Sequence, residues 1–297
     1  MKPLAWLCTA ALCISLCACS NPSSPTDTTS STTSVPSTVS TTATKPAATT
    51  APTQPQTPTK TIYVRTSYTK KSDTMDALTE YVYDENDLLT EVIQYSGTTL
   101  TKRYTVTCDD NGNYTQWDSE SDTETLSARY FWDEEGRNLG NAQYLNDVLQ
   151  YSTTYTWTDG LLVDTVSSMP EQSLETRLQY TYNSENLRVR SDYFVNNSLQ
   201  RYGVYSIDDH GRTSSISYYL PDGTAYYTTS YLYGTLNETQ ITQSTEGVVT
   251  QKIITTYDTN GNVLTIQTYN GQNTLLSTET NTWKAITVPQ DSPRASA

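Results

Sequence analysis

The sequence predicts an all-β protein, an elongated and curled antiparallel β-meander of about 16–18 strands built from repeats of roughly 25 residues. Three observations predict this fold class. Aromatic residues recur at nearly constant spacing after residue 60, and most are followed directly by Asp or Asn. Turn-forming residues lie after these aromatics and halfway between them. No helical period or helix-capping pattern occurs in the same region.

Residues 1–18 are predicted to be a lipoprotein signal peptide. Lys2 precedes an apolar run that ends at Leu16 and is too short to span a membrane. The run Leu16-Cys17-Ala18-Cys19 resembles the bacterial lipobox, which implies that Cys19 carries a palmitate-type lipid and begins the mature chain. Attached acyl chains contribute ~0.8 kcal/mol per buried CH₂, so we expect a lipid anchor at the extracellular face of the cell membrane. An ordinary secretory signal is the alternative.

Residues 19–60 are predicted to be the lipidated Cys followed by a disordered tether. Ser, Thr and Pro occupy 29 of the 41 positions from Ser20 to Lys60. Such a segment buries too little apolar surface to offset its conformational entropy. Once the signal is removed, Cys108 is the only cysteine besides Cys19, so no intramolecular disulfide is expected. Stability must then come from packing and strand pairing.

The repeat domain is predicted to span residues 61–288 and is marked by nine anchor positions that are 24–26 residues apart. Seven of them are aromatic anchors with a predicted structural role; in chain order the nine are Tyr83, Cys108, Trp132, Trp157, Tyr182, Ile207, Tyr233, Tyr257 and Trp283. A Tyr lies two residues before most anchors, which places both side chains on one face of a strand. One unit buries too little to fold alone, so neighbouring units must stabilise each other.

Short turns follow the anchors, and their glycines are predicted to adopt the left-handed conformation: Gly112, Gly136, Gly160, Gly211 and Gly261. Asp87 and Asn186 occupy the equivalent place in two other turns, and these residue types tolerate positive φ. A second set of turns lies between anchors, at Ser96-Gly97, Asn146-Asp147, Asn196-Asn197, Asp222-Gly223, Glu246-Gly247 and Asn270-Gly271. Each unit therefore contains two strands and two turns. Residues 289–297 are predicted to be a disordered tail.

The unit Tyr81-Val-Tyr83-Asp84-Glu-Asn-Asp-Leu88 resembles the YD repeat of RHS-type bacterial surface and toxin proteins, and so does the run 255–263. The resemblance covers about residues 62–288. It implies a β-hairpin architecture whose strands wind, in the family, into a hollow shell that can enclose a toxic C-terminal domain. Because so few residues follow the last unit, we expect no such enclosed domain. Eight or nine units are few for a shell, so an open, curled sheet is expected.

The composition disfavours several kinds of chemistry. The chain has 32 acidic and 18 basic residues and a net charge of −14, which argues against nucleic acid as a partner. His210 is the only imidazole, so a nucleophilic triad or a His-based metal site is not expected. The turns at 109–113 and 258–262 offer oxygen atoms at alternate positions but lack the distal Glu of a calcium loop. We expect no cofactor, no metal and no enzymatic activity.

These features together predict a non-catalytic, lipid-anchored extracellular surface protein that acts as a structural or adhesive β-repeat scaffold. The alternative is a cell-wall or glycan-binding module that uses exposed Trp and Tyr rings. The expected partners are the membrane, through the anchor, and a cell-wall or host glycan or a protein. The exposure of Trp132, Trp157 and Trp283 should distinguish the two hypotheses: exposed rings along one groove favour glycan binding, and buried rings favour a scaffold.

Overall fold

The computed structural model describes residues 58–121 and 123–290. The predicted signal peptide, the predicted lipidation site Cys19 and most of the predicted tether and tail lie outside these residues. Within the described part, the first strand begins at Thr59 and the last ends at Pro289. Thr59 and Lys60, which we expected in the tether, and Pro289, which we expected in the tail, therefore belong to strands.

The described residues form eighteen strands and one short 3₁₀ turn, η1 (Pro170–Gln172). The strands are β1 (Thr59–Ser72), β2 (Met75–Tyr83), β3 (Leu89–Ser96), β4 (Thr99–Cys108), β5 (Tyr114–Glu120), β6 (Thr125–Trp132), β7 (Asn138–Leu145), β8 (Val148–Thr158), β9 (Leu161–Met169), β10 (Leu174–Tyr182), β11 (Arg188–Val195), β12 (Ser198–Ile207), β13 (Thr213–Tyr219), β14 (Ala225–Tyr233), β15 (Asn237–Ser244), β16 (Val249–Tyr257), β17 (Val263–Asn270) and β18 (Leu275–Pro289). The all-β class and the strand number agree with the sequence prediction.

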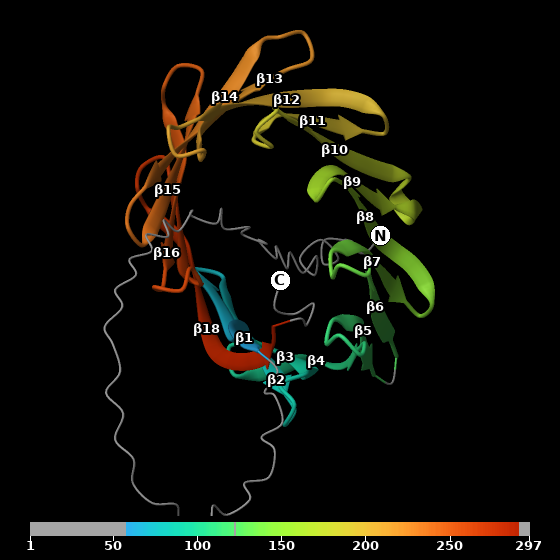
Figure 1. Ribbon diagram of the computed structural model, residues 1–297. Helices are drawn as coiled ribbons and strands as arrows, with labels where there is room; N and C mark the ends of the chain where they lie inside the picture. Colours follow the sequence, from blue (N-terminus) through green and yellow to red (C-terminus); the bar gives the residue numbers. More distant parts are fainter. Residues whose placement is uncertain (1–57, 122, 291–297) are drawn as a thin grey trace, which may run out of the picture. The chain divides into compact units, whose positions relative to one another are not determined.

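The sheet is a closed antiparallel barrel (Figure 1). Every strand pairs with its neighbours in sequence, and β18 pairs with β1, so that the strand order runs around a complete ring. The prediction of an open, elongated meander is therefore wrong. An open sheet would leave the hydrogen-bonding groups of its first and last strands unpaired, whereas closure satisfies both edges.

β-Bulges supply the curvature that closes the ring. Most of the strand pairs contain a register shift, for example between Thr107 and Cys108 in the β4–β5 pair and between Thr156 and Trp157 in the β8–β9 pair. A bulge bends its strand and increases the local twist. Because the shifts recur with the repeat, their bends accumulate in one direction, and nine units suffice to bring β18 back to β1.

The pairing of β1 with β18 is the longest in the sheet and joins the two ends of the described chain. Its register runs from Thr59 opposite Pro289 to Ser72 opposite Ser277. Lys70 Nζ lies 2.7 Å from Glu279 Oε1 within this pair. At the end of the pair away from that ion pair, Ile286 and Val288 are buried and pack against side chains of β1. Charge pairing, apolar packing and a long ladder together hold the ring closed.

The turns after the anchors take the predicted conformation. Glycine has φ between 76° and 84° at Gly112, Gly136, Gly160, Gly211 and Gly261. Asp87 and Asn186 have φ of 59° and 61°, so they adopt the left-handed conformation in place of Gly. The turn predicted at Asn270-Gly271 is present, and its left-handed residue is Asn273, with φ of 62°.

Candidate functional site

One face of the sheet carries most of the aromatic side chains, and we call it the aromatic face. Residues directly opposite in a ladder point to the same face. Val92 lies opposite both Tyr81 and Tyr104. Trp117 lies opposite Val106, two residues after Tyr104, and opposite Ala128, two residues before Tyr130, so all of these side chains share one face. The period of two within strands and the register between them thus place the tyrosines of successive units on a single face.

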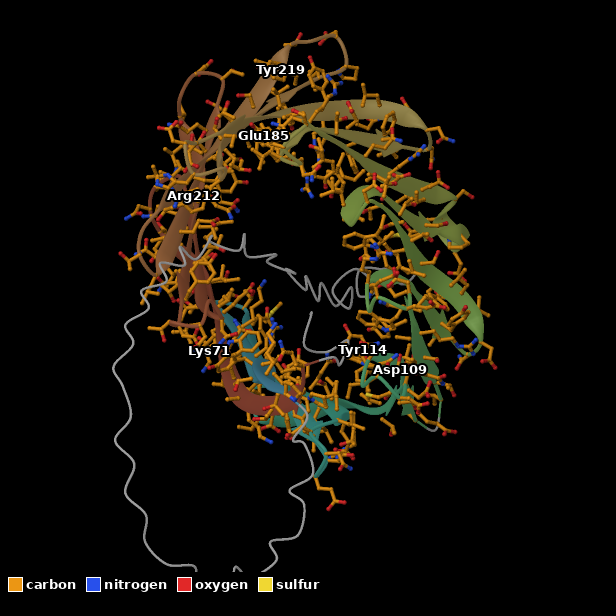
Figure 2. All side chains as sticks on the ribbon, viewed as in Figure 1. Lys71, Asp109, Tyr114, Glu185, Arg212 and Tyr219 are labelled. Atoms are coloured by element: carbon orange, nitrogen blue, oxygen red, sulfur yellow. The ribbon has the colours of Figure 1, made fainter. Side chains whose placement is uncertain are left out.

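The aromatic face is the inside of the barrel. Burial raises the pKa of Tyr130, and nearby Tyr104, Tyr81 and Tyr155 contribute to the same rise. Tyr81 on β2 and Tyr130 on β6 are four strands apart, which would be roughly 19 Å on a flat sheet. They influence each other because the rings converge on the concave side. In Figure 2, Tyr114 lies on the inner side of the ring and Lys71 on the outer side.

The anchors donate hydrogen bonds to the backbone of the preceding strand. In each case the acceptor is a carbonyl 18–20 residues earlier, and the bonds are Tyr83 Oη to Arg65 O (2.8 Å), Trp132 Nε1 to Tyr114 O (2.9 Å), Trp157 Nε1 to Asn138 O (2.8 Å), Tyr182 Oη to Leu162 O (2.7 Å), Tyr233 Oη to Thr213 O (2.8 Å) and Trp283 Nε1 to Val263 O (2.9 Å). Cys108 makes a weaker version, with its thiol 3.5 Å from Leu89 O. Tyr257 ends β16 at the equivalent position. The anchors thus bond to carbonyls near bulges, where the ladder is interrupted.

The carboxylates that follow the anchors organise the turns. Asp208 Oδ1 accepts the backbone N–H groups of His210 and Arg212, each at 2.9 Å, and Asp208 Oδ2 accepts the guanidinium of Arg212 at 2.8 Å. The Arg212 guanidinium holds the pKa of Asp208 down at about 2. In the turn after Tyr182, Asn183 Oδ1 accepts the backbone N–H groups at the equivalent positions, those of Glu185 and Leu187. The acidic residue that follows an anchor therefore caps its turn by accepting backbone N–H groups.

The calcium interpretation of these turns has little to support it. Asp258 Oδ1 accepts two backbone N–H groups, and its Oδ2 accepts the side-chain amide of Asn262 at 2.8 Å. The oxygens expected to hold a cation are therefore occupied by the turn itself. His210 lies in such a turn, and its backbone N–H donates a hydrogen bond to Asp208 Oδ1. Across residues 58–121 and 123–290, no cluster of His, Cys, Asp and Glu has the composition of a metal site.

The tryptophans of the described residues are built into the wall. Trp117 is 2% exposed and packs against Tyr104, Tyr114 and Tyr130 with ring centroids 5.6–6.1 Å apart. The anchors Trp132, Trp157 and Trp283 are half-buried, and the indole N–H of each is used by a backbone carbonyl. They do not form an exposed stripe of rings.

Charged residues are distributed unequally between the faces and the turns. The strand residues with charge on the aromatic face are Arg65, Lys70, Lys102, Arg188, Arg201, Glu238 and Glu279. Cations outnumber acids there, although the whole chain has a net charge of −14. The acidic excess lies in the turns. Asp109 and Glu185, labelled in Figure 2, are two of these acidic turn residues. The inside of the barrel is thus aromatic and cationic, and its ends are acidic.

Arg188 is enclosed by tyrosine rings. Its guanidinium carbon lies 3.9 Å from the ring centre of Tyr180, 5.7 Å from that of Tyr182 and 6.0 Å from that of Tyr205. Nη2 donates to the Tyr182 hydroxyl at 3.3 Å, and Nε is buried without a hydrogen-bond partner among the described residues. In the same part of the chain, no carboxylate forms an ion pair with Arg188.

Arg201 lies on the same face toward the opposite end of the strands. Its guanidinium carbon is 4.3 Å from the ring centre of Tyr193, which lies opposite it in the β11–β12 ladder. Burial raises the pKa of Tyr218 to about 12, and the charge of Arg201 opposes that rise, so the guanidinium is within electrostatic range of this ring. On the same face, Tyr218 lies opposite Tyr227, and their rings stack with centroids 4.3 Å apart.

Sequence reasoning missed Arg188 and Arg201. For Arg201 the available signal was the alternation of strand residues, because it lies four positions from the inward-facing Tyr205. Alternation alone places Arg188 on the outer face, and the β-bulge between Arg188 and Arg190 turns it inward. The proximity of Arg188 and Arg201 to tyrosines of other strands could not be predicted, because it depends on the direction in which the sheet curves. Outside the strands, the part of the chain that the structure describes contains no helix with the length and apolarity needed to cross a membrane.

No protein-family model matches the chain, and no curated protein matches it. Similar solved structures include TcdB2–TccC3–Cdc42, which is 13% identical over 74% of this chain and 14% of that chain with a TM-score of 0.38. A porin-like protein from Bacteroides vulgatus is 10% identical over 74% of this chain and 98% of its own, with a TM-score of 0.33. A porin-like protein from Bacteroides uniformis is 14% identical over 74% and 96%, with a TM-score of 0.28. At these values the likenesses assign neither a family nor a function to this chain.

Proposed function

We propose that this chain is a non-catalytic, lipid-anchored surface protein whose barrel of YD-like repeats serves as a structural or adhesive scaffold at the extracellular face of the cell membrane. The observation that carries the scaffold proposal is the set of hydrogen bonds that the anchor side chains make within the sheet. The polar atom of almost every Tyr and Trp anchor bonds to a backbone carbonyl, so these conspicuous side chains hold the wall together. The lipobox-like run and the Ser/Thr/Pro segment support the anchoring part of the proposal.

The glycan-binding alternative loses support in the form that relied on tryptophan. Trp132, Trp157 and Trp283 are half-buried, and their N–H groups are not free to bind a sugar hydroxyl. A scaffold requires what these residues provide, a wall that keeps its shape without a conventional core. Any glycan-binding role would have to use other residues.

Anchoring is tested with the full chain produced in a bacterial host supplied with a palmitate analogue. We expect Cys19→Ala to lose the label and to leave the membrane fraction, because the lipid thioether forms at that thiol. Cys17→Ala is the matched control, since it removes a neighbouring thiol and should keep both label and membrane attachment. Retention of label in Cys19→Ala would show that the anchoring proposal is wrong.

Adhesion is tested separately with beads coated with the full chain. We expect the beads to bind bacterial or host cells, and free neutral oligosaccharides should leave that binding unchanged if the scaffold contacts protein. Complete inhibition by one glycan would instead support the alternative function. No attachment to any cell type would remove the adhesive role.

A further inference from the structure

Two arginines on the inner wall of β11 and β12 lack the carboxylate partners that most arginines elsewhere on the barrel have, although Arg65 and Arg129 also form no ion pair among the described residues. On the outer face, Arg190 pairs with Asp192 at 2.6 Å, and Arg177 pairs with Asp164 at 2.7 Å. Arg188 and Arg201 form no ion pair with any described residue. Arg188 and Arg190 are only two residues apart on β11, but the β-bulge between them places them on opposite faces of the sheet.

An enclosed guanidinium without a carboxylate is costly, since removing a cation from water is repaid only by good electrostatic partners. The three tyrosine rings around Arg188 offer some cation–π stabilisation. They accept one hydrogen bond, from Nη2, and Nη1 has no hydrogen-bond partner among the described residues, while Nε is buried. The arrangement fits a site that waits for an acidic group.

Arg188 and Arg201 stand at the two ends of a continuous strip. Arg201 pairs with Tyr193, which is five residues along β11 from Arg188, so the two arginines are roughly 17 Å apart at ~3.4 Å per residue. Tyr180, Tyr205 and Tyr218 lie between them on the same face. We call these five side chains, Arg188, Tyr180, Tyr205, Tyr218 and Arg201, the arginine–tyrosine strip.

Gly203 lies at the middle of the strip and keeps it flat. A Cβ at this position would be 3.0 Å from Ser191 Oγ, 3.0 Å from Ile216 Cγ2 and 3.1 Å from Tyr218 Cε1. The absence of a side chain lets the Tyr218 ring lie close to the wall.

We propose that the arginine–tyrosine strip binds an acidic oligosaccharide, with uronic acid carboxylates held by Arg188 and Arg201 and sugar rings lying on the tyrosines between them. The planar guanidinium matches a carboxylate with two parallel hydrogen bonds. Tyrosine offers an apolar ring face for the sugar and a neutral hydroxyl for its polar groups. The proposal goes beyond the scaffold role. The lipid-anchoring proposal does not depend on it and is tested separately.

An acidic peptide fits the strip less well. Extended peptides commonly bind by adding a strand to a free sheet edge, and the closed barrel has none. The acidic turns repel any polyanion at a distance, but at physiological ionic strength this repulsion is screened beyond ~8 Å. Contacts at the strip are much shorter than that distance, so they decide the binding.

The test is isothermal titration calorimetry of the detergent-extracted full chain with a hexamer of galacturonic acid, a neutral maltohexaose of the same length, and poly-glutamate. We expect the acidic hexamer to bind at least tenfold more tightly than the neutral one. Arg188→Gln and Arg201→Gln should each weaken binding of the acidic hexamer at least tenfold. Arg188→Lys should recover part of the loss, because it restores charge without the planar fork.

Arg190→Gln is the matched control. Arg190 shares β11 with Arg188 and also lies over a tyrosine ring, 4.2 Å from the centre of Tyr202, but it is on the opposite face with its own carboxylate. It should leave binding unchanged. No binding of the acidic hexamer to the unmodified chain, equal weakening by Arg190→Gln, or Arg188-dependent binding of poly-glutamate would each overturn the proposal. Circular dichroism verifies the fold of each variant, and Arg201→Gln tests the strip if Arg188→Gln does not fold.

Discussion

At the scale of single residues, the polar atoms of the anchors fill a gap that the fold itself creates. A bulge near the start of a strand interrupts the ladder, and the carbonyl there has no backbone partner. The phenol or indole of the next strand supplies the missing donor, as Tyr233 does for Thr213 O at 2.8 Å. This explains why Tyr and Trp occupy the anchors, since Phe would fill the same space and leave the carbonyl unsatisfied.

Tyr233→Phe should lower the free energy of unfolding by about 1–2 kcal/mol, because it removes the donor and leaves Thr213 O without its partner. Tyr231→Phe is the matched control on the same strand and face, since no hydrogen bond of the Tyr231 hydroxyl is found within the described residues. It should change stability much less. Urea denaturation of both variants measures the difference, and equal losses would mean that ring packing alone explains the anchors.

The turn carboxylates predict how stability depends on acid. The folded pKa of Asp208 is about 2, below the ordinary value of ~3.9, so ionised Asp208 favours the folded state. Its contribution is complete above about pH 4 and is lost as the pH falls to about 2. Asp208→Asn keeps a side-chain oxygen that can accept the backbone N–H groups of the turn, as Asn183 Oδ1 does in the turn after Tyr182. It loses the charge that pairs with Arg212.

The variant should therefore be less stable than the unmodified chain at pH 5 and show a shallower loss between pH 4 and pH 2. Denaturant titrations across this range measure both slopes. Asp209→Asn in the same turn is the control, because none of the described residues forms a hydrogen bond or an ion pair with the Asp209 carboxylate. An unchanged slope in Asp208→Asn would assign the acid sensitivity to other groups.

At the scale of strands and turns, glycine has two separate uses in this chain. In the turns it supplies positive φ, as Gly261 does with φ of 84° and nothing within 4 Å of an added Cβ. Within β7, Gly140 also has φ of 148°, and a Cβ there would lie 2.2 Å from the Thr153 carbonyl oxygen on β8. The first use is conformational, and the second is a close approach of two backbones.

Gly140→Ala should therefore cost about 3 kcal/mol, because the β7–β8 pair must move apart to admit the methyl group. Gly261→Ala should cost only about 1 kcal/mol, which is the penalty for a left-handed residue with space around it. Thermal and urea denaturation compare the two. A similar cost at both positions would show that the contact with Thr153 is relieved by a small local shift.

At the scale of the whole molecule, closure changes the stability of the array. In an open array each end unit has one neighbour and frays, whereas in a ring every unit has two. The last residues of the pair are joined as well, because Gln290 N donates to Pro58 O at 2.8 Å. We expect such a ring to unfold in one cooperative transition.

Closure is tested by a disulfide across the β1–β18 pair. Thr61 lies opposite Thr287, and both are exposed, so Thr61→Cys with Thr287→Cys in a Cys108→Ser background should form an intramolecular bond under mild oxidation. The bond should stabilise the barrel by about 2–4 kcal/mol. Thr61→Cys with Thr158→Cys, on β8, should form none. Failure of the first pair to crosslink would favour an open sheet.

The features that local sequence determined are those that depend on a few neighbouring residues. Alternation of side chains defined the strands, Asp and Gly at fixed offsets defined the turns, and the constant spacing of Tyr83, Trp132 and the other anchors defined the repeat. Even the left-handed Asp87 and Asn186 were predictable, because φ is set by the residue and its immediate turn. Strand number followed directly from the length of the repeat.

Only the tertiary structure decided that the sheet closes, which face lies inside and which charges meet there. Closure depends on the sum of many small bends along residues 59–289, and no single unit contains that sum. The convergence of Arg188 with Tyr180, Tyr182 and Tyr205 depends on the direction of curvature, because a concave face brings the side chains of successive strands closer together. The sequence therefore determined the units and their turns, and long-range geometry determined the enclosed surface.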